Sequence, residues 1–182
     1  MYEVEVKVPA DHDVVRARLE DVDAEFEGRV EQADTYFDAP HRDFATTDEA
    51  LRVRRETVGG ETSARITYKG PLVDAESKTR AEIETGVDNG EDATAIFEQL
   101  GFEAAATVEK TRERYAYEEY TVVLDDVTGL GEYVEVETES IEDDGALEEA
   151  RAGAFDLIRL LELDPDDQIR RSYLGLLLDI RE

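Results

Sequence analysis

Residues 1–8 read MYEVEVKV, and the alternation of these residues decides the fold class of the chain. Successive side chains of a β-strand point to opposite faces, so Glu3, Glu5 and Lys7 share one face and the apolar residues share the other. Two interpretations fit this pattern. The charged face is either the solvated side of an edge strand or the lining of an enclosed, functional interior, and the choice between them determines what the protein does.

The length and composition of the chain predict one soluble domain. Its 182 residues suffice for a sizeable core, and the absence of cysteine excludes disulfides, thiolate metal sites and a cysteine nucleophile. The longest apolar stretch, around residues 174–178, is far shorter than the roughly 20 residues that span a membrane. The first strand begins at Tyr2, which leaves no room for a secretory signal. We therefore expect a cytoplasmic protein that does not associate with a membrane.

The chain is strongly acidic, with 48 aspartate and glutamate residues, 20 lysine and arginine residues, and a formal net charge of −28. The negative electrostatic potential that follows from this charge repels nucleic acid and anionic membrane surfaces, so neither is an expected partner. Hydrophobic residues make up 41% of the chain and recur periodically, which argues against disorder. Sixteen of the basic residues are arginine and only four are lysine. This composition favours adaptation to a high-salt environment.

We expect the protein to lose stability as the salt concentration falls. At roughly 1 M ionic strength the screening length is about 3 Å, so acidic side chains repel one another little, whereas dilution restores the repulsion. Urea unfolding followed by circular dichroism, in molar KCl and in dilute buffer, measures this change. Equal free energies of unfolding in the two solutions would contradict the adaptation to high salt.

Alternation and turn residues predict about eight strands and three or four helices. The expected strands cover about residues 2–8, 25–38, 49–58, 62–71, 78–87, 107–118, 120–127 and 132–139. The expected helices cover about residues 11–19, 92–100, 143–163 and 168–180, with Pro165 ending the third. Short connections make the strands mostly antiparallel, and a sheet of this length tends to curl or close. The sequence therefore predicts one α+β domain over residues 1–182, built on one large sheet.

The same alternation places charged residues in rows along these strands. The basic rows contain Lys7, Arg52, Arg54, Arg65, Lys69, Arg80, Lys110, Arg112 and Arg114, and the acidic rows contain Glu3, Glu5, Glu82, Glu84, Asp125, Glu135 and Glu137. Nine of the 20 basic residues but only seven of the 48 acidic residues lie in these rows, which reverses the acid excess of the chain. Either one face of the sheet is solvated and its charges pair across strands, or the sheet closes into a barrel with the charges inside. Buried charges require partners, and a polyanion with its metal ions would satisfy both signs together.

The order of several motifs resembles that of the CYTH proteins, the triphosphate tunnel metalloenzymes. The motifs are the ExExK pattern at Glu3, Glu5 and Lys7, YFD at 36–38, LRVR at 51–54, YKGP at 68–71, RAEIE at 80–84, VEKTRERY at 108–115 and VVLDDVTGLGEYVEVE at 122–137. The last of these, together with RRSYLGLLL at 170–178, is most similar to the class IV adenylyl cyclase branch. Gly175 departs from that branch, in which we expect an acidic residue at this position.

The resemblance implies an eight-stranded antiparallel closed β-barrel, a tunnel with helices packed outside, in a homodimer that binds a triphosphate with Mg²⁺ or Mn²⁺. By position, the expected metal ligands are Glu5, Glu135 and Glu137, with Glu3 nearby. The expected phosphate-binding residues are Lys7, Arg52, Arg54, Lys69, Arg80, Lys110 and Arg112. Catalytic roles fall to Glu5, Lys7, Lys69, Lys110, Arg112 and Asp125, and supporting roles to Glu82 and Glu84.

The function that the resemblance implies is that of an adenylyl cyclase, which converts ATP to cyclic AMP and pyrophosphate. The same residues would also serve a triphosphate hydrolase acting on thiamine triphosphate or inorganic tripolyphosphate. A non-catalytic module that binds polyphosphate or nucleotide is the third possibility. His12 opens a helix and His41 lies in a loop, and we expect both to be solvated rather than catalytic.

Overall fold

The computed structural model describes residues 1–140 and 143–181, which form one barrel and its surrounding helices. The strands are β1 (Tyr2–Pro9), β2 (Glu25–Asp38), β3 (Ala50–Val58), β4 (Glu61–Leu72), β5 (Lys78–Val87), β6 (Glu103–Tyr117), β7 (Tyr120–Val127) and β8 (Gly131–Ser140). The helices are α1 (His12–Asp21), α2 (Phe44–Thr47), α3 (Gly90–Gln99), α4 (Asp144–Leu160) and α5 (Tyr173–Arg181), with a 3₁₀ turn η1 (Pro165–Asp167) before α5.

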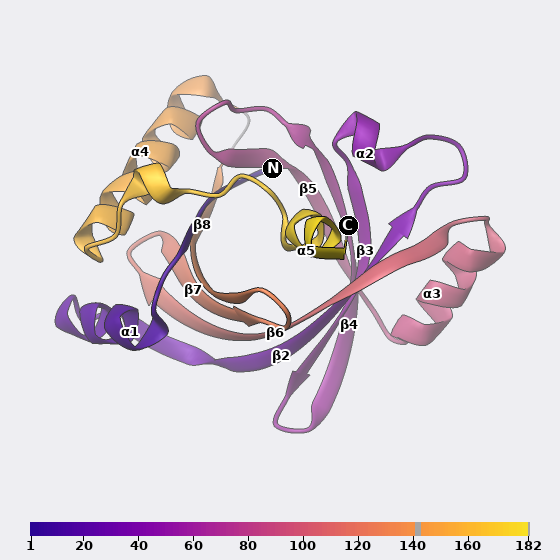
Figure 1. The fold of residues 1–182 in the computed structure, drawn as a ribbon, viewed down its shortest axis with the longest axis horizontal. Coiled ribbons are helices and arrows are strands. Elements are labelled where there is room, and N and C mark those ends of the chain that lie inside the picture. Colours follow the sequence, from indigo (N-terminus) through magenta and orange to yellow (C-terminus); the bar gives the residue numbers. More distant parts are fainter. Residues whose placement is uncertain (141–142, 182) are drawn as a thin grey trace.

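The eight strands close into an antiparallel barrel in the order β1-β5-β4-β3-β2-β6-β7-β8, which confirms the predicted fold (Figure 1). Closure decides between the two interpretations of the first strand. Glu5 and Lys7 of β1 are 5% and 1% exposed and face the interior of the barrel, while Val4 and Val6 are fully buried on its outer side. The charged face therefore lines an enclosed space rather than meeting solvent.

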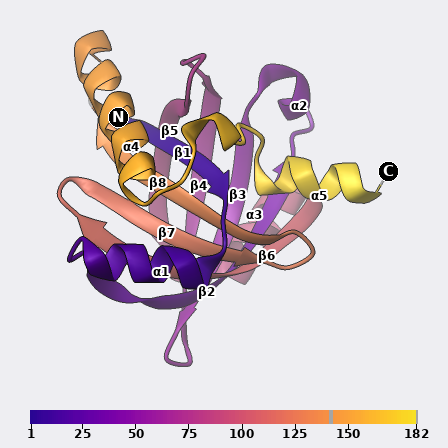
Figure 2. The same cartoon turned by 60° about the vertical axis from the view of Figure 1, so that its left-hand side comes forward.

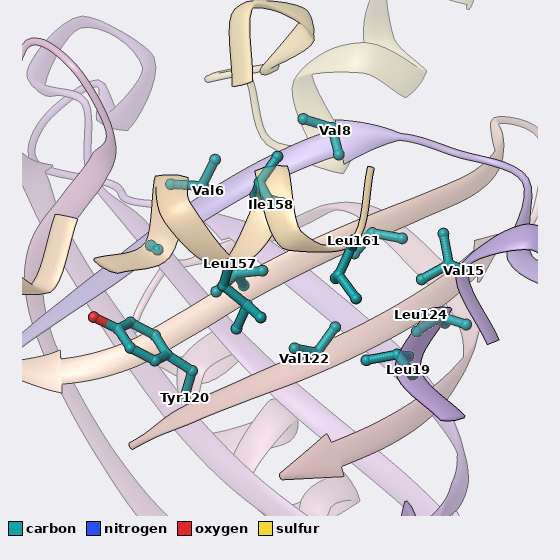
Figure 3. Close-up of a cluster of buried hydrophobic side chains, with 13 residues drawn as sticks. Val6, Val8, Val15, Leu19, Tyr120, Val122, Leu124, Leu157, Ile158 and Leu161 are labelled. Carbon is teal, nitrogen blue, oxygen red and sulfur yellow. The ribbon is translucent and has the colours of Figure 1, made fainter. Parts of the chain in front are cut away.

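The main hydrophobic core lies outside the barrel wall, between the strands and two helices (Figure 3). The outward side chains of β1, β7 and β8 pack against α1 and α4, and the members of this core include Val6, Val8, Val15, Leu19, Val122, Leu124, Leu157, Ile158 and Leu161. A second core joins α3 to β3 around Phe37, Leu51, Val53 and Ala93. Both faces of these strands are thus covered, one by apolar packing and the other by the charged interior.

Helix ends follow from local capping. Asp11 caps α1 by accepting hydrogen bonds from the backbone N–H groups of Asp13 and Val14, and Asn89 caps α3 in the same way. Gly101 follows α3 with φ of +93°, a left-handed conformation that glycine adopts without a Cβ clash. These helices begin and end within two residues of their predicted bounds.

The C-terminal prediction was partly wrong. The last helix begins at Tyr173 rather than near residue 168, and α4 ends at Leu160, before Pro165 begins the 3₁₀ turn. Residues 168–172 are held in a non-helical path by long-range hydrogen bonds, since the N–H of Ile169 donates to the carbonyl of Lys7 (2.8 Å) and Gln168 donates to the carbonyl of Glu76 (2.7 Å). The four-residue helix α2 was not predicted; Asp43 caps it.

The segment between α4 and α5 crosses one end of the barrel, so that α5 lies over the opening of the ring of strands (Figure 1). Figure 2 shows α4 and α5 on opposite sides of the barrel, joined by this segment. The helices of the described residues all pack outside the barrel, and α5 lies at one end of the barrel rather than against its side. Within the described residues, no helix combines the length and the apolar character needed to span a bilayer.

Candidate active site

The barrel contains a cavity of about 1150 Å³ that is lined by its inward-facing charged side chains. The predicted site residues that line it are Glu3, Glu5, Lys7, Arg52, Arg54, Lys69, Arg80, Glu82, Glu84, Lys110, Arg112, Glu135 and Glu137. Asp125, the remaining predicted residue, lies directly behind Arg112 with its side chain fully buried. The charged residues that alternation identified on six separate strands therefore line one common cavity.

Three carboxylates form the group in this cavity that could hold a metal ion. Oxygen atoms of Glu3, Glu5 and Glu137 all lie within 4.8 Å of one another. Burial raises the pKa of Glu137 to about 8, and the like charges of Glu3, Glu135 and Glu5 add to this effect although Arg112 opposes it. Crowded, buried carboxylates of this kind are the donor set that a divalent cation prefers.

Glu135 belongs to the predicted metal set, but the structure surrounds it with cations. Its carboxylate accepts a hydrogen bond from Nη2 of Arg112 (2.9 Å) and lies 3.4 Å from Nζ of Lys7. Burial alone would raise the pKa of Glu135, but Lys7 and Arg112 hold that pKa well below its usual value. The three carboxylates that lie close together are therefore those of Glu3, Glu5 and Glu137. Glu135 lies instead among the lysine and arginine side chains.

Arg112 and Asp125 form the centre of that cationic part. The guanidinium donates Nε to Oδ1 and Nη2 to Oδ2 of Asp125, both at 2.6 Å, which is the bidentate geometry of a strong ion pair. Nζ of Lys110 lies 3.6 Å from the same carboxylate. Burial and the neighbouring Arg112 lower the pKa of Lys110 to about 8, although Asp125 opposes them.

Arg52 and Arg54 on β3 are oriented by Asp34, a residue that the sequence analysis missed. Arg54 donates Nε and Nη2 to the two oxygens of Asp34, each at 2.7 Å, and Arg52 donates Nη1 at 3.5 Å. Burial would raise the pKa of Asp34, but these guanidinium groups hold it well below its usual value. Alternation along β2 does place Asp34 inward, yet its neighbours on that face, Gln32 and Tyr36, are uncharged, so no row of charge marked it.

The remaining predicted residues make a third cluster near β4 and β5. Lys69 pairs with Glu3 (3.1 Å) and Glu82 (2.9 Å), and burial together with Glu3 raises the pKa of Glu82 to about 7 against the effect of Lys69. Glu84 is more exposed and accepts hydrogen bonds from Arg65 (2.9 Å) and Thr67 (2.8 Å). Arg80 donates to the carbonyls of Gly70 (2.9 Å) and Asp48 (3.3 Å).

Two further residues complete the site. Lys78, which shares the inward alternation of Arg80, donates Nζ to Glu5 at 2.8 Å. Tyr173, the first residue of α5, donates its hydroxyl to Asp125 (2.9 Å), and its ring lies 3.9 Å from Nζ of Lys7 and 4.9 Å from Nζ of Lys110. No local pattern marks Tyr173, because its position depends on the non-helical path of residues 168–172.

The prediction that His12 is solvated was wrong. Its side chain is 2% exposed and Nε2 donates to the backbone carbonyl of Tyr133 at 3.0 Å, on the outside of the barrel wall. His41 is exposed, as predicted. Neither histidine is among the residues that line the cavity.

Comparison with known proteins gives consistent matches over the whole chain. A protein of Methanocaldococcus jannaschii named "Putative adenylate cyclase" is 38% identical over 177 residues, covering 97% of this chain and 98% of that protein. A solved structure from Pyrococcus horikoshii is 38% identical with a TM-score of 0.91, covering 98% of this chain and 99% of that one. A Hippeastrum structure, named "Putative adenylyl cyclase" and described as revealing a dominant triphosphatase activity, is 16% identical with a TM-score of 0.70 over 98% of this chain and 95% of that one, a likeness of fold alone.

The family model described as the CYTH domain matches residues 1–173, which is nearly the full length of the sequence. Since that match spans the barrel and all of the site residues, the protein belongs to the CYTH domain family.

Proposed function

We propose that this protein binds ATP with a divalent metal inside the barrel and converts it to cyclic AMP and pyrophosphate. The observation that carries the proposal is that one cavity holds both a group of three carboxylates and a set of buried lysine and arginine side chains. Carboxylate oxygens bind a hard divalent metal ion, and lysine and arginine side chains bind phosphate oxygens. A triphosphate with its bound metal ion would therefore pair with both groups of side chains. The name of the M. jannaschii relative supports the cyclase in particular.

The carboxylate group fits Mg²⁺ or Mn²⁺ by its donor chemistry. Both ions bind oxygen ligands and complete their coordination with water and substrate phosphates. Glu3, Glu5 and Glu137 would hold the ion, and a cation there would offset the burial and, secondarily, the neighbouring carboxylates that together raise the pKa of Glu137. When bound, the metal would neutralise phosphate charge and polarise the phosphorus–oxygen bonds.

The arginine and lysine side chains would orient the triphosphate. Arginine presents a planar fork that matches phosphate oxygens, and Arg54 and Arg112 are each already fixed by two hydrogen bonds to a buried aspartate. In the proposed reaction the ribose 3′-hydroxyl releases its proton to water and its oxygen bonds to the α-phosphorus. The bond from the α-phosphorus to the oxygen that bridges it to the β-phosphorus breaks, and pyrophosphate leaves with that oxygen. Lys7, Lys69 and Lys110 would stabilise the departing pyrophosphate, since such transfers depend mainly on in-line positioning and neutralisation of charge.

Triphosphate hydrolysis is the second candidate function. In that reaction water would attack the terminal phosphorus of thiamine triphosphate or tripolyphosphate in the same cavity. The description of the Hippeastrum protein, which has the same fold, favours this alternative. The metal carboxylates and the phosphate-binding cations would serve both reactions, so these residues do not discriminate between them.

The test is to identify the products. The protein is incubated with ATP, with thiamine triphosphate and with tripolyphosphate, in molar KCl with Mg²⁺ or Mn²⁺, and the products are separated by ion-exchange chromatography. Cyclic AMP with pyrophosphate would support the cyclase, and orthophosphate would support the hydrolase. Binding without turnover would indicate a non-catalytic module and contradict both.

A further inference from the structure

We propose that Lys78 is a positioning residue for the metal site, because it holds the carboxylate of Glu5 in the orientation that binds the ion. This inference rests on the proposed function, which places a divalent metal ion among the carboxylates of Glu3, Glu5 and Glu137. Lys78 is one of only four lysines in the chain, and none of the sequence motifs assigned a role to it.

The side chain of Lys78 forms a buried ion pair with Glu5. The two residues lie directly opposite each other on the β1–β5 ladder, and Nζ of Lys78 donates to Oε1 of Glu5 at 2.8 Å. Their side chains are 10% and 7% exposed, and among the described residues Glu5 is the only carboxylate within 4.0 Å of this lysine. Nζ of Lys7 approaches the same oxygen at 3.8 Å. Because both lysines lie beside Oε1, a metal ion would bind Glu5 through Oε2.

The other two carboxylates of the proposed metal site each have a basic side chain beside them as well. Nζ of Lys69 lies 3.1 Å from Oε2 of Glu3, and Nη1 of Arg112 lies 3.9 Å from Oε1 of Glu137. Lys78 supplies the corresponding contact for the third carboxylate. Metal-binding carboxylates are commonly held by such hydrogen-bonding partners, which fix the direction in which the ligand oxygen points.

The backbone of Lys78 is fixed by the loop that precedes it. This loop, residues 73–77, joins β4 to β5. Arg151 of α4 donates to the carboxylate of Asp74 at 2.9 Å, and Arg170 donates to the backbone carbonyl of Asp74 at 2.7 Å. A side chain that extends from a fixed backbone loses less conformational entropy when it forms an ion pair, so it can hold its partner in one orientation.

Two effects of Lys78 on metal binding oppose each other. Loss of a side chain that orients a metal ligand typically weakens metal binding ~10- to 100-fold. The positive charge of Lys78 repels the metal ion, although molar KCl screens part of this repulsion. Since the repulsion offsets part of the gain from orientation, we expect loss of Lys78 to weaken metal binding about 10-fold, the lower end of that range.

Direct binding of phosphate is the alternative role for Lys78, because this residue lines the cavity. Its ammonium group is already bound to Glu5, so a phosphate would have to compete with that ion pair. The two roles affect different ligands. A positioning residue changes the affinity for the metal ion in the absence of phosphate, whereas a phosphate ligand changes the affinity for phosphate in the absence of metal.

The experiment measures binding by isothermal titration in molar KCl with two separate probes, Mn²⁺ alone and tripolyphosphate alone in EDTA. Lys78→Met nearly keeps the length of the side chain but removes its charge and donors. We expect this variant to bind Mn²⁺ about 10-fold more weakly and tripolyphosphate more weakly by a smaller factor. Lys78→Arg keeps the charge and the donors and should retain most of the Mn²⁺ affinity. The control, Arg159→Met, removes an exposed arginine that pairs with Asp156 outside the cavity, and it should change neither affinity.

The contrary results are distinguishable. If Lys78→Met binds Mn²⁺ as tightly as the wild type or more tightly, Lys78 does not position the metal ligand and the inference fails. A greater loss for tripolyphosphate than for Mn²⁺ would assign Lys78 to phosphate binding instead, and an equal loss of Mn²⁺ affinity in Lys78→Arg would also contradict the inference. If circular dichroism shows that Lys78→Met is unfolded, Lys78→Gln is measured in its place with the same expectation. A wild type that binds neither probe would contradict the proposed function itself.

Discussion

Replacing Glu137 with glutamine is expected to reduce metal-dependent turnover by at least about 100-fold while leaving the barrel folded. The substitution removes one of three carboxylates whose oxygens lie within 4.8 Å of one another. Loss of groups that merely orient metal ligands costs about 10- to 100-fold, so loss of a direct ligand should cost at least the upper end of that range. The amide keeps the shape of the side chain, and burial already favours the uncharged form of Glu137, since it raises the pKa to about 8.

Turnover with each triphosphate and binding of Mn²⁺ by isothermal titration are measured together, since a metal ligand must affect both. Glu109→Gln is the control, because Glu109 is an exposed glutamate on β6 outside the carboxylate group. Chelation by EDTA should abolish the activity of the wild type, and added Mn²⁺ should restore it. Normal turnover and normal Mn²⁺ binding by Glu137→Gln would refute the assignment of the metal site.

Replacing Asp125 with asparagine is expected to lower the free energy of unfolding by about 3–5 kcal/mol. The carboxylate is fully buried and binds Arg112 through both oxygens, Lys110 at 3.6 Å and the hydroxyl of Tyr173 at 2.9 Å. An amide cannot neutralise these cations, and burial of a charge without its partner is costly. The effect is large because one side chain organises three others.

The adjacent Asp126 supplies a matched control, since it is the next residue on β7 but points outward and is exposed. Asp126→Asn should change the free energy of unfolding by no more than about 0.5 kcal/mol. Urea unfolding in molar KCl, followed by circular dichroism, measures both variants. Equal stability of the two would mean that the buried pair around Arg112 contributes little to the fold.

Much of the barrel could be predicted from alternation, because most of the strands have one apolar face and one charged face. The bounds of β2 and β5 agree with the prediction to the residue. The C-terminal region could not be predicted in the same way. Residues 168–172 have apolar and polar residues compatible with a helix, but hydrogen bonds to Lys7 and Glu76, far away in the sequence, hold them in another path.

The same limit applies to the site. Alternation and the family resemblance identified which side chains face the cavity, but they could not identify which carboxylates converge. Lys7 pairs with Glu135 across the β1–β8 ladder, and Glu5 pairs with Glu137, so strand register determines that Glu135 lies among cations and Glu137 lies among acids. Asp34 was missed for a related reason, since its neighbours on the same face of β2 are uncharged and its partners are on the neighbouring strand. The homodimer and the adaptation to high salt stay predictions.

The burial of both faces of β1 limits which length changes this strand can accept. A one-residue insertion directly after Glu3 would reverse the facing of every later side chain in the strand, so that Glu5 and Lys7 would point toward α4 and the valines into the cavity. The exposed β3–β4 turn at Gly59 and Gly60 has no such constraint and is the natural place to lengthen the chain or attach a tag. Engineering of this protein should therefore leave the first eight residues intact and use that turn.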